Sequence, residues 1–410
     1  RATSPRLDAP SPLDPRPSGS ILPPMFWKKK TPAADAPDDE RLLAALSTVD
    51  DPELHKDLVS LKMVKRAVLH EGSAFITIEL TTPACPLKDT IRGDIEAAVE
   101  REVPGTKVEV EWTAQVRHGR HGGGGNPQDL PGLNEVANVI LVASGKGGVG
   151  KSTVATNLAC ALQRTGARVG LLDADIYGPS IPTMFDAHDD VTSSDGKTID
   201  PMVKDGLKLM SMGFLVAPEK GLIWRGPMLD SAVTQFLRDV AWGELDYLVV
   251  DLPPGTGDVQ LTFAQKLKVT GAVVVSTPQD VALADVVRAK AMFDQVKIPV
   301  LGLIENMSYF VCDGCDRKHF IFDHGGAKRA AERMEMAFLG EIPITPAVRI
   351  GGDQGRPVVQ SEPDSPVGQA FVGLARTLAA KISVLNAEAE IRAEQSGRSK
   401  AARRSLPILG

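Results

Sequence analysis

The chain has 410 residues, of which 43% are apolar and 24% charged, a composition typical of globular proteins with room for two domains and linkers. A formal net charge of -6 gives no electrostatic reason to expect binding to nucleic acid or stable association with an anionic membrane. No apolar run reaches the roughly 18 residues of a membrane span, and four cysteines are too few for a disulfide framework, so we expect a cytoplasmic protein.

Residues 1–37 are predicted to form a disordered extension. The stretch RATSPRLDAPSPLDPRPSGSILPP is rich in Pro and Ser, has no hydrophobic periodicity and lacks the apolar core of a signal peptide. Met25, in MFWKKK, is the expected natural start of the protein.

Residues 38–115 are predicted to form a small α+β domain. DERLLAALSTV has the apolar spacing of a helix, and SAFITIEL alternates as a half-buried strand does. LKDTIRGDIEAAVEREVPG repeats apolar residues every fourth position and stops at Pro104-Gly105, which indicates an amphipathic helix. KVEVEW supplies a second strand. Four consecutive glycines then predict a flexible linker over residues 116–135.

Residues 136–384 are predicted to form an α/β domain. NVILVA, RVGLLD, YLVVD, GAVVVST and PVLGLIEN are short and almost wholly apolar, and helical stretches separate them. This alternation indicates a parallel sheet covered by helices on both faces. Residues 385–410 are predicted to form a polar, increasingly basic tail, either a frayed helix with a solvated end or a docking segment.

A phosphate-binding loop follows the first of these strands. GKGGVGKS matches G-x-x-x-x-G-K-[ST] between a strand and a helix, as the motif requires. Backbone N–H groups in such a loop face the phosphates, Lys151 reaches the β and γ oxygens, and the Ser152 hydroxyl binds Mg²⁺. The expected nucleotide contacts are Gly145, Lys146, Gly147, Gly148, Val149, Gly150, Lys151, Ser152 and Thr153.

Carboxylates end two of the predicted strands. RVGLLDAD delivers Asp173 and Asp175, and YLVVD delivers Asp251, which has the form of a Walker B residue that steadies Mg²⁺. Ligands bind at the carboxyl ends of parallel strands. The alternative, that the aspartate only caps a turn, is credible for Asp173 and weak for Asp251.

Lys146 is a second cation in a loop that already contains Lys151. It is either a solvated surface lysine or a group that reaches the nucleotide of a second subunit and stabilises transition-state charge, as an arginine finger does.

Cys312 and Cys315 form a C-x-x-C after the fifth apolar strand. Two thiolates are half of a tetrahedral zinc site or of a Cys₄-ligated iron–sulfur cluster, and the chain has no second C-x-x-C. Two copies across a two-fold axis would supply four thiolates. A redox dithiol is a further alternative, but the pair lacks the usual placement at a helix N-terminus. Cys160 is expected to be a core residue.

The loop KGGVGKS is similar to that of the deviant Walker A ATPases, a group that includes MinD, ParA, the nitrogenase iron protein and the Mrp proteins. The resemblance implies that Lys146 acts across a face-to-face ATP dimer and that Asp175 orients the attacking water. DLPPGTGD is similar to switch II, with Asp251 and Asp258, and Asn306 resembles the asparagine that recognises adenine.

Within this group the chain resembles the Mrp/ApbC branch over roughly residues 134 to 375, through DADIYGPSIP, IWRGPM and ENMSYFVCDGCDRKHFIFDHGGA. The resemblance implies an ATP-hydrolysing homodimer whose cysteines bridge a [4Fe–4S] cluster between subunits. Its partners would be an upstream assembly scaffold and apo iron–sulfur proteins that receive the cluster. CDGC departs from relatives that often carry proline or histidine between the cysteines. This difference would alter how readily the cluster is lost, but it keeps both cysteine ligands.

DPELHKDLVSLKMV and LTTPACPLKD resemble the small iron–sulfur-assembly domain often fused ahead of Mrp ATPases. Cys85 precedes the helix that begins near Leu87, so helix N–H groups are expected to lower its pKa. Cys85 is thus a candidate cluster-transfer thiol, or else a structural cysteine in a Pro-rich turn.

Two other functions stay open. A MinD- or ParA-like positioning ATPase would bind membrane or DNA, against which stand the net charge of -6 and the lack of a strongly apolar, amphipathic C-terminal helix. Alternatively, the same ATPase would hold structural zinc at Cys312 and Cys315.

Overall fold

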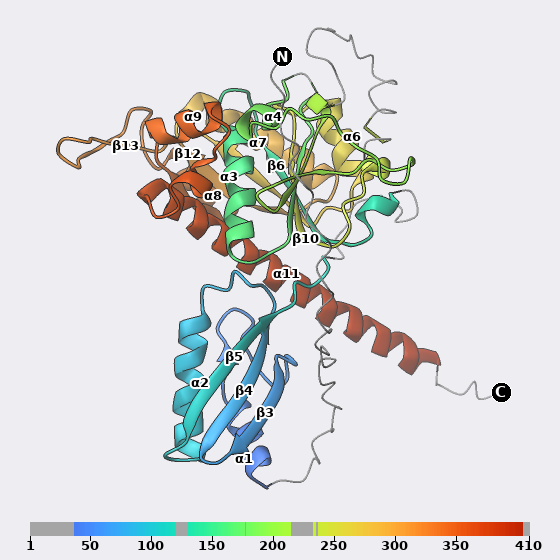
Figure 1. Cartoon of the computed structure of the whole chain (residues 1–410), viewed down its shortest axis with the longest axis vertical. Helices are drawn as coiled ribbons and strands as arrows, with labels where there is room; N and C mark the ends of the chain where they lie inside the picture. Colours follow the sequence, from blue (N-terminus) through green and yellow to red (C-terminus); the bar gives the residue numbers. More distant parts are fainter. Residues whose placement is uncertain (1–36, 120–129, 177, 215–232, 235–236, 405–410) are drawn as a thin grey trace, which may run out of the picture.

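The computed structural model describes residues 37–119, 130–176, 178–214, 233–234 and 237–404 (Figure 1). Residues 1–36 of the predicted disordered extension, which include Met25, and the four consecutive glycines of the linker lie outside these residues. Pro37, the last residue of that predicted extension, begins the helix α1 (Pro37–Leu46).

The small domain is a three-stranded sheet with helices. Its strands β3 (Val64–His70), β4 (Ser73–Leu80) and β5 (Lys107–Ala114) lie in that order, with β3 antiparallel and β5 parallel to β4. Every second residue of β4 is buried, as the alternation in the sequence predicts. The helix α2 (Lys88–Glu102) buries Ile91, Ile95 and Val99, which confirms the predicted amphipathic helix. Also present are α1 (Pro37–Leu46), β1 (Asp50–Asp51) and β2 (Lys56–Asp57).

The second domain contains an eight-stranded sheet in the order β15-β12-β11-β6-β10-β7-β9-β8. The five predicted apolar runs are β6 (Val136–Ala143), β7 (Val169–Asp173), β10 (Leu245–Asp251), β11 (Gly271–Ser276) and β12 (Val300–Asn306). The sequence did not predict β8 (Met202–Lys204), β9 (Leu207–Ser211) and β15 (Phe338–Ile342). Neighbouring strands are parallel, except that β8 is antiparallel to β9 at one edge.

Helices cover both faces of this sheet (Figure 1). The core on one face includes residues of α3 (Lys151–Arg164) and α11 (Pro366–Arg404), and the core on the other includes residues of α6 (Asp258–Lys266), α7 (Asp280–Gln295) and α8 (Gly326–Arg333). Shorter elements are η2 (Pro131–Leu133), α4 (Ile181–Met184), η3 (Met212–Phe214), β13 (Phe310–Val311), β14 (Lys318–His319), α9 (Pro346–Asp353) and α10 (Val358–Ser361). The sheet is the predicted parallel α/β architecture.

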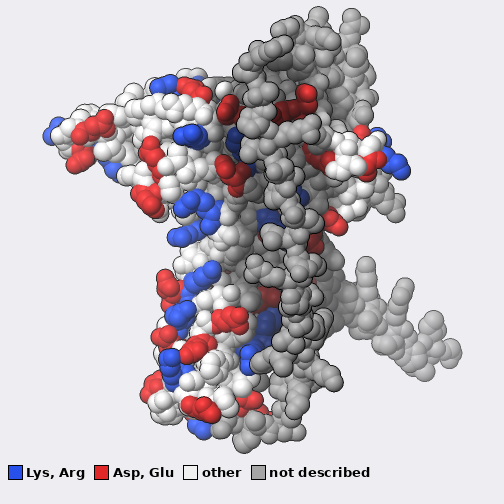
Figure 2. All heavy atoms as spheres, viewed as in Figure 1, with Lys and Arg blue, Asp and Glu red and all other residues white. Residues whose placement is uncertain are grey.

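The long helix α11 leaves the sheet and passes the small domain (Figure 1). Its Ser383 hydroxyl is hydrogen-bonded to Thr81, and its Glu390 pairs with Arg117 at 2.7 Å. By length and composition, Pro366–Arg392 includes a stretch that could cross a membrane, but 61% of that stretch is buried inside the protein, as in a core helix. Positive and negative side chains are interspersed over the described part of the face in Figure 2.

A second contact between the domains is made by the loop that precedes α2. The hydroxyls of Thr82 and Tyr247 lie 3.2 Å apart in a buried position. Ala84 is 3% exposed and belongs to the core of the second domain, although it precedes α2 in the chain. The small domain is therefore attached through this loop as well as through α11.

Candidate nucleotide site and cysteine hairpin

The phosphate loop lies between β6 and α3, where the sequence predicts it. Gly148 and Gly150 have φ of 82° and 78°, in the left-handed region that favours glycine. A Cβ at Gly150 would lie 2.3 Å from Nδ2 of Asn306, which donates a hydrogen bond of 2.8 Å to the carbonyl of Val149. The loop thus needs glycine both for its turn and for its contact with the end of β12.

Lys151 and Asp251 form a buried ion pair behind the loop. The distance from Lys151 Nζ to Asp251 Oδ1 is 2.6 Å, and the two side chains are 6% and 0% exposed. Lys151 also donates to the Ser152 hydroxyl at 3.2 Å. Burial raises the pKa of Asp251, and the charge of Lys151 opposes this rise. The sequence predicts both residues at the nucleotide site, and the structure places them in contact.

The donor set beside this pair fits Mg²⁺. Asp251 Oδ2 is buried and has no hydrogen-bond partner among the residues that the structure describes. The Ser152 hydroxyl is linked to Asp251 through Lys151. Hydroxyl and carboxylate oxygens are the ligands that Mg²⁺ takes, together with substrate phosphates and water. When bound there, Mg²⁺ would neutralise phosphate charge.

The segment that begins at Asp175 forms a loop against the end of β7. Asp175 accepts a hydrogen bond from the amide of Gly178 at 3.2 Å. Asp173 is fully buried and accepts the amide of Asp175 at 3.1 Å, which confirms that it caps a turn. Burial, followed by the charge of Asp251, raises the pKa of Asp173 to about 7.

The segment after β10 is tied to the phosphate loop. The amide of Gly255 donates to the carbonyl of Ser144 at 3.1 Å, and Gln260 Nε2 donates to the carbonyls of Pro253 and Pro254. Asp258 begins α6, but its side chain lies outside the described set.

A cavity of about 520 Å³ opens next to the phosphate loop. Gly150 and Thr153 line it from the loop side, Asn306 from the end of β12, and Ile344 and Thr345 from the segment before α9. Asn306 therefore lines the same cavity as the phosphate-loop residue Gly150.

Lys146 is half-buried at the apex of the loop, and its carbonyl accepts the Ser144 hydroxyl at 2.9 Å. Within the described ranges its ammonium group forms no ion pair. The structure of one chain thus brings Lys151, Ser152 and Asp251 together and leaves Lys146 outside that cluster.

Cys312 and Cys315 lie on the turn between β13 and β14. This hairpin projects from the second domain, on the left in Figure 1. The amide of Cys315 donates to the carbonyl of Cys312 at 3.4 Å. Hydrogen bonds from the amide of Gly314 and from Cys315 lower the pKa of Cys312. Cys315 is exposed, and the nearby Phe320 and Ile321 are 49% and 57% exposed. The hairpin presents two thiols beside apolar side chains.

Comparison with known proteins identifies the family. Residues 135–379 match the profile described as ParA, NUBPL iron-transfer P-loop NTPase, and residues 39–112 match that of an iron–sulfur cluster assembly protein. The chain belongs to the NUBPL iron-transfer P-loop NTPase family.

Two relatives match most of the chain, and a solved structure matches a little over half of it. An iron–sulfur cluster carrier protein of Deinococcus radiodurans is 51% identical over 348 residues, which are 84% of this chain and 96% of the relative. Another from Synechocystis is 46% identical over 351 residues, with 84% and 98% covered. A solved ADP complex of a nucleotide-binding protein from Archaeoglobus fulgidus is 42% identical, with a TM-score of 0.51, and covers 56% of this chain and 92% of its own.

The thiol of the small domain differs from the sequence-based expectation for this NTPase. Burial raises the pKa of Cys85, although a hydrogen bond from the amide of Leu87 lowers it. The expected lowering of the pKa is therefore wrong. The helix begins at Lys88, but Cys85 packs against the core of the small domain, and the charges of Glu53 and Asp51 raise its pKa further. Cys160 is a buried core residue, as predicted, with a raised pKa.

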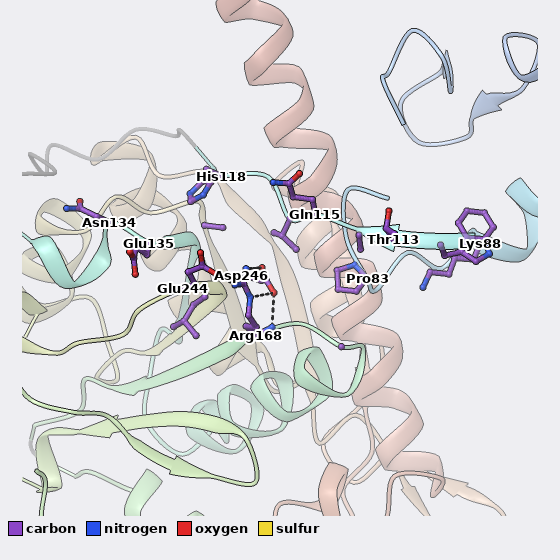
Figure 3. A pocket seen from close by; sticks show the side chains of 16 residues that line it. Pro83, Lys88, Thr113, Gln115, His118, Asn134, Glu135, Arg168, Glu244 and Asp246 are labelled. Carbon is purple, nitrogen blue, oxygen red and sulfur yellow. Dashed lines mark hydrogen bonds and ion pairs between the residues drawn. The ribbon is translucent and has the colours of Figure 1, made fainter. Parts of the chain in front are cut away.

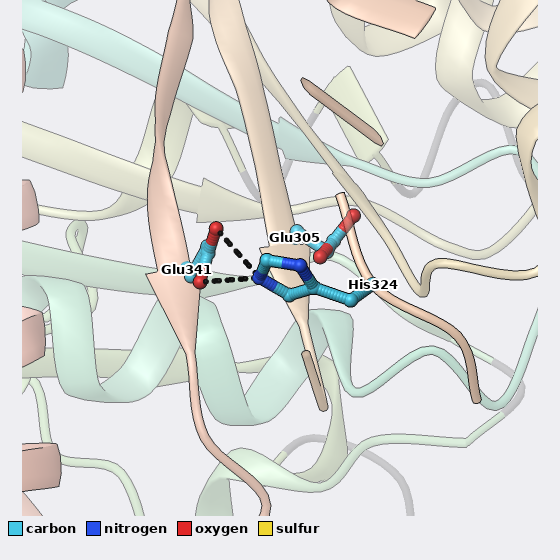
Figure 4. Close-up of side chains that lie close together, drawn as sticks. All are labelled: Glu305, His324 and Glu341. Carbon is cyan, nitrogen blue, oxygen red and sulfur yellow. Dashed lines mark hydrogen bonds and ion pairs between the residues drawn. The ribbon is translucent and has the colours of Figure 1, made fainter. Parts of the chain in front are cut away.

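Two further features of this NTPase could be mistaken for ligand sites. Figure 4 shows Glu305, His324 and Glu341, whose ligand atoms lie within 4.8 Å of one another. Glu305 already accepts the amides of Gly325 and Ala327 and the hydroxyl of Ser308, so it anchors the start of α8. His324 Nε2 is 3.3 Å from Glu341. We therefore read this cluster as structural.

The other feature is a cavity of about 680 Å³ between the two domains (Figure 3). Its Arg168 is paired with Asp246 at 2.9 Å and with Glu244. Asp246 Oδ2 also accepts the amide of Arg168 at 2.8 Å. The guanidinium of Arg168 is thus already held by two carboxylates, and none of the residues of the phosphate loop lines this cavity.

Proposed function

We propose that this chain is an ATP-hydrolysing iron–sulfur cluster carrier that works as a homodimer in the cytoplasm. Its cargo would be a [4Fe–4S] cluster held by Cys312 and Cys315 of two copies and delivered to apo iron–sulfur proteins after loading from an assembly scaffold. The observation that carries the proposal is the pair of thiols on the β13–β14 hairpin, on a chain that also has a complete phosphate loop. Cys315 is exposed, and Cys312 is half-buried and has a lowered pKa.

The proposed hydrolysis begins when ATP phosphates enter the loop. Lys151 exchanges Asp251 for the β and γ oxygens, and Asn306 contacts the adenine. Asp175 orients a water that attacks the γ phosphorus, the bond to the β–γ bridging oxygen breaks, and ADP and phosphate form. Lys146 of the partner copy stabilises the charge that develops on the transferred group.

Cluster transfer requires that the two nucleotide states of the dimer differ in affinity for the cluster. Because each chain contributes only two thiols at this hairpin, closing or opening the dimer would change how many thiolates hold the cluster. This link between hydrolysis and the hairpin is the coupling that we propose.

Anaerobic reconstitution tests the cargo. The wild-type chain should take up about two irons per chain, because one cluster of four irons is shared by two copies. Cys312→Ala should lose this uptake, whereas Cys160→Ala, which changes a buried core thiol, should keep it. Stoichiometric zinc without cluster uptake would contradict the proposal and favour a structural zinc site.

Lys146→Ala tests the trans role. We expect this variant to bind ATP with unchanged affinity but to lose hydrolysis by ~10³-fold, the scale of a missing trans cation. Lys107→Ala, on the small domain, is the matched lysine control. If Lys146→Ala hydrolyses ATP at the wild-type rate, Lys146 is a solvated surface lysine that takes no part in hydrolysis.

A further inference from the structure

Asp173 is a buried carboxylate that the proposed hydrolysis does not use. Its side chain is 0% exposed at the end of β7. Oδ1 accepts the amide of Asp175 at 3.1 Å. Oδ2 accepts the amides of Ser180 and Ile181, both at 3.1 Å, and the hydroxyl of Ser211 at 3.0 Å. A buried carboxylate is costly unless it is hydrogen-bonded, and this one is surrounded by donors.

The donors come from both ends of one loop. Asp175 opens the loop, and Ser180 and Ile181 close it where α4 begins. One carboxylate therefore holds the two ends of the loop together. Between these ends, Asp175 accepts the amide of Gly178, so the position of the Asp175 carboxylate depends on where the chain around Gly178 lies.

Ser211 fixes this arrangement to the neighbouring strand. It is the last residue of β9, which pairs with β7, and Ser211 lies opposite Asp173 in the register. Its hydroxyl also accepts the amide of Gly213 at 3.0 Å. A Cβ at Gly213 would lie 3.0 Å from Pro179, so the loop packs closely on the chain after β9.

We propose that Asp173 is a positioning residue that holds Asp175 close to Ser180 and Ile181 and so sets the place of the Asp175 carboxylate for hydrolysis. The inference rests on the proposed ATP hydrolysis and deepens it. The deprotonated carboxylate suits this task because both of its oxygens accept hydrogen bonds, whereas an asparagine would turn an NH₂ group toward some of the donors.

Steady-state kinetics provide the first test. Asp173→Asn should lower kcat by about 10- to 100-fold, the scale of a misplaced reacting group, and leave KM for ATP within about twofold. Ser211→Ala should lower kcat several-fold, and Ser211→Thr, which keeps a hydroxyl, should restore it. Asp195→Asn is the matched control, because exposed Asp195 also accepts two loop amides, from Lys197 and Thr198, and should hydrolyse ATP at the wild-type rate.

Amide hydrogen exchange without nucleotide provides the second test. In Asp173→Asn, exchange at Ser180 and Ile181 should be at least about tenfold faster than in the wild type, because their acceptor is impaired. This readout does not depend on hydrolysis. A wild-type chain that does not hydrolyse ATP would contradict the proposed function and leave the exchange experiment able to support or contradict the loop closure.

Three results would overturn the inference: unchanged kcat and exchange in Asp173→Asn, a lower kcat with unchanged exchange, or a higher KM with unchanged kcat. If Asp173→Asn does not fold, the comparison of Ser211→Ala with Ser211→Thr decides by the same two measurements. Equal kcat and equal exchange in those two variants would then contradict the proposal.

Discussion

Lys151→Met removes the charge that, among the residues that the structure describes, pairs with the fully buried Asp251, and it keeps a side chain of similar length. The carboxylate must then remain charged without a partner or take up a proton. Protonating an aspartate of ordinary pKa 3.8 at pH 7 costs about 4 kcal/mol, which sets an upper limit on the damage. We therefore expect the nucleotide-free variant to be less stable by about 3–4 kcal/mol at pH 7.

The loss should depend on pH. In the variant, folded Asp251 has a raised pKa and stays protonated, whereas unfolded Asp251 releases its proton above about pH 4. The folded state then binds more protons, so stability falls as pH rises. The deficit should shrink as the pH falls below 7, by at most about 1.4 kcal/mol for each pH unit, because the raised pKa of Asp251 in the wild type gives that chain part of the same pH dependence. Double substitution with Asp251→Asn should recover most of the loss, because no buried charge remains.

The free energy of unfolding is measured in urea at pH 5.5, 6.5 and 7.5. Amide exchange of peptides from β10 serves as the readout, so that the unfolding of the second domain is observed by itself. This matters because a two-domain chain need not unfold in one step. Lys107→Met is the control: its pair with Glu109 is 74% and 45% exposed and should contribute less than about 1 kcal/mol. A loss that is equal at all three pH values, or that persists in the double variant, would refute the reasoning.

Two further outcomes concern the cysteines and the contact between domains. Because the pKa of Cys312 is lowered and that of Cys85 is raised, iodoacetamide at pH 8 should modify Cys312 faster than Cys85. Peptide mass spectrometry measures both rates, and equal rates would contradict the opposite pKa shifts of the two thiols. Tyr247→Phe removes the 3.2 Å contact with the Thr82 hydroxyl and should cost about 1 kcal/mol. It should also speed amide exchange in the loop before α2, and unchanged exchange would show that this contact does not hold the loop.

The sequence was sufficient for the features that depend on neighbouring residues. The glycines of the phosphate loop, the apolar strands and the amphipathic α2 follow local rules of backbone conformation and periodicity. The position of Asp251 beside Lys151 followed from the rule that parallel strands end at one edge. The same rule placed Asp173 there, but only as a turn cap.

The features that could not be predicted from the sequence depend on contacts between residues that are far apart in the chain. Asp173 meets Ser211 across 38 positions, and β9 itself was not predicted. The expectation for Cys85 considered the nearby helix and omitted burial, which is set by residues around Cys85 in the folded core. Burial can outweigh a helix N-terminus because removing a charge from water costs more than a few oriented N–H groups return.

The helix α11 has a consequence for any attempt to study the domains apart. Phe371 and Leu378 are buried in the core of the second domain, whereas Asn386, further along the same helix, donates to the carbonyl of Arg117 and to Asn138, both at 2.9 Å. A chain ended after residue 384 would keep the first set of contacts and lose the second. Asn138 Oδ1 would keep only the Thr270 hydroxyl as a donor, and Arg117 would lose both Asn386 and Glu390. Shortening the protein at one end would thus loosen the attachment of the domain at the other.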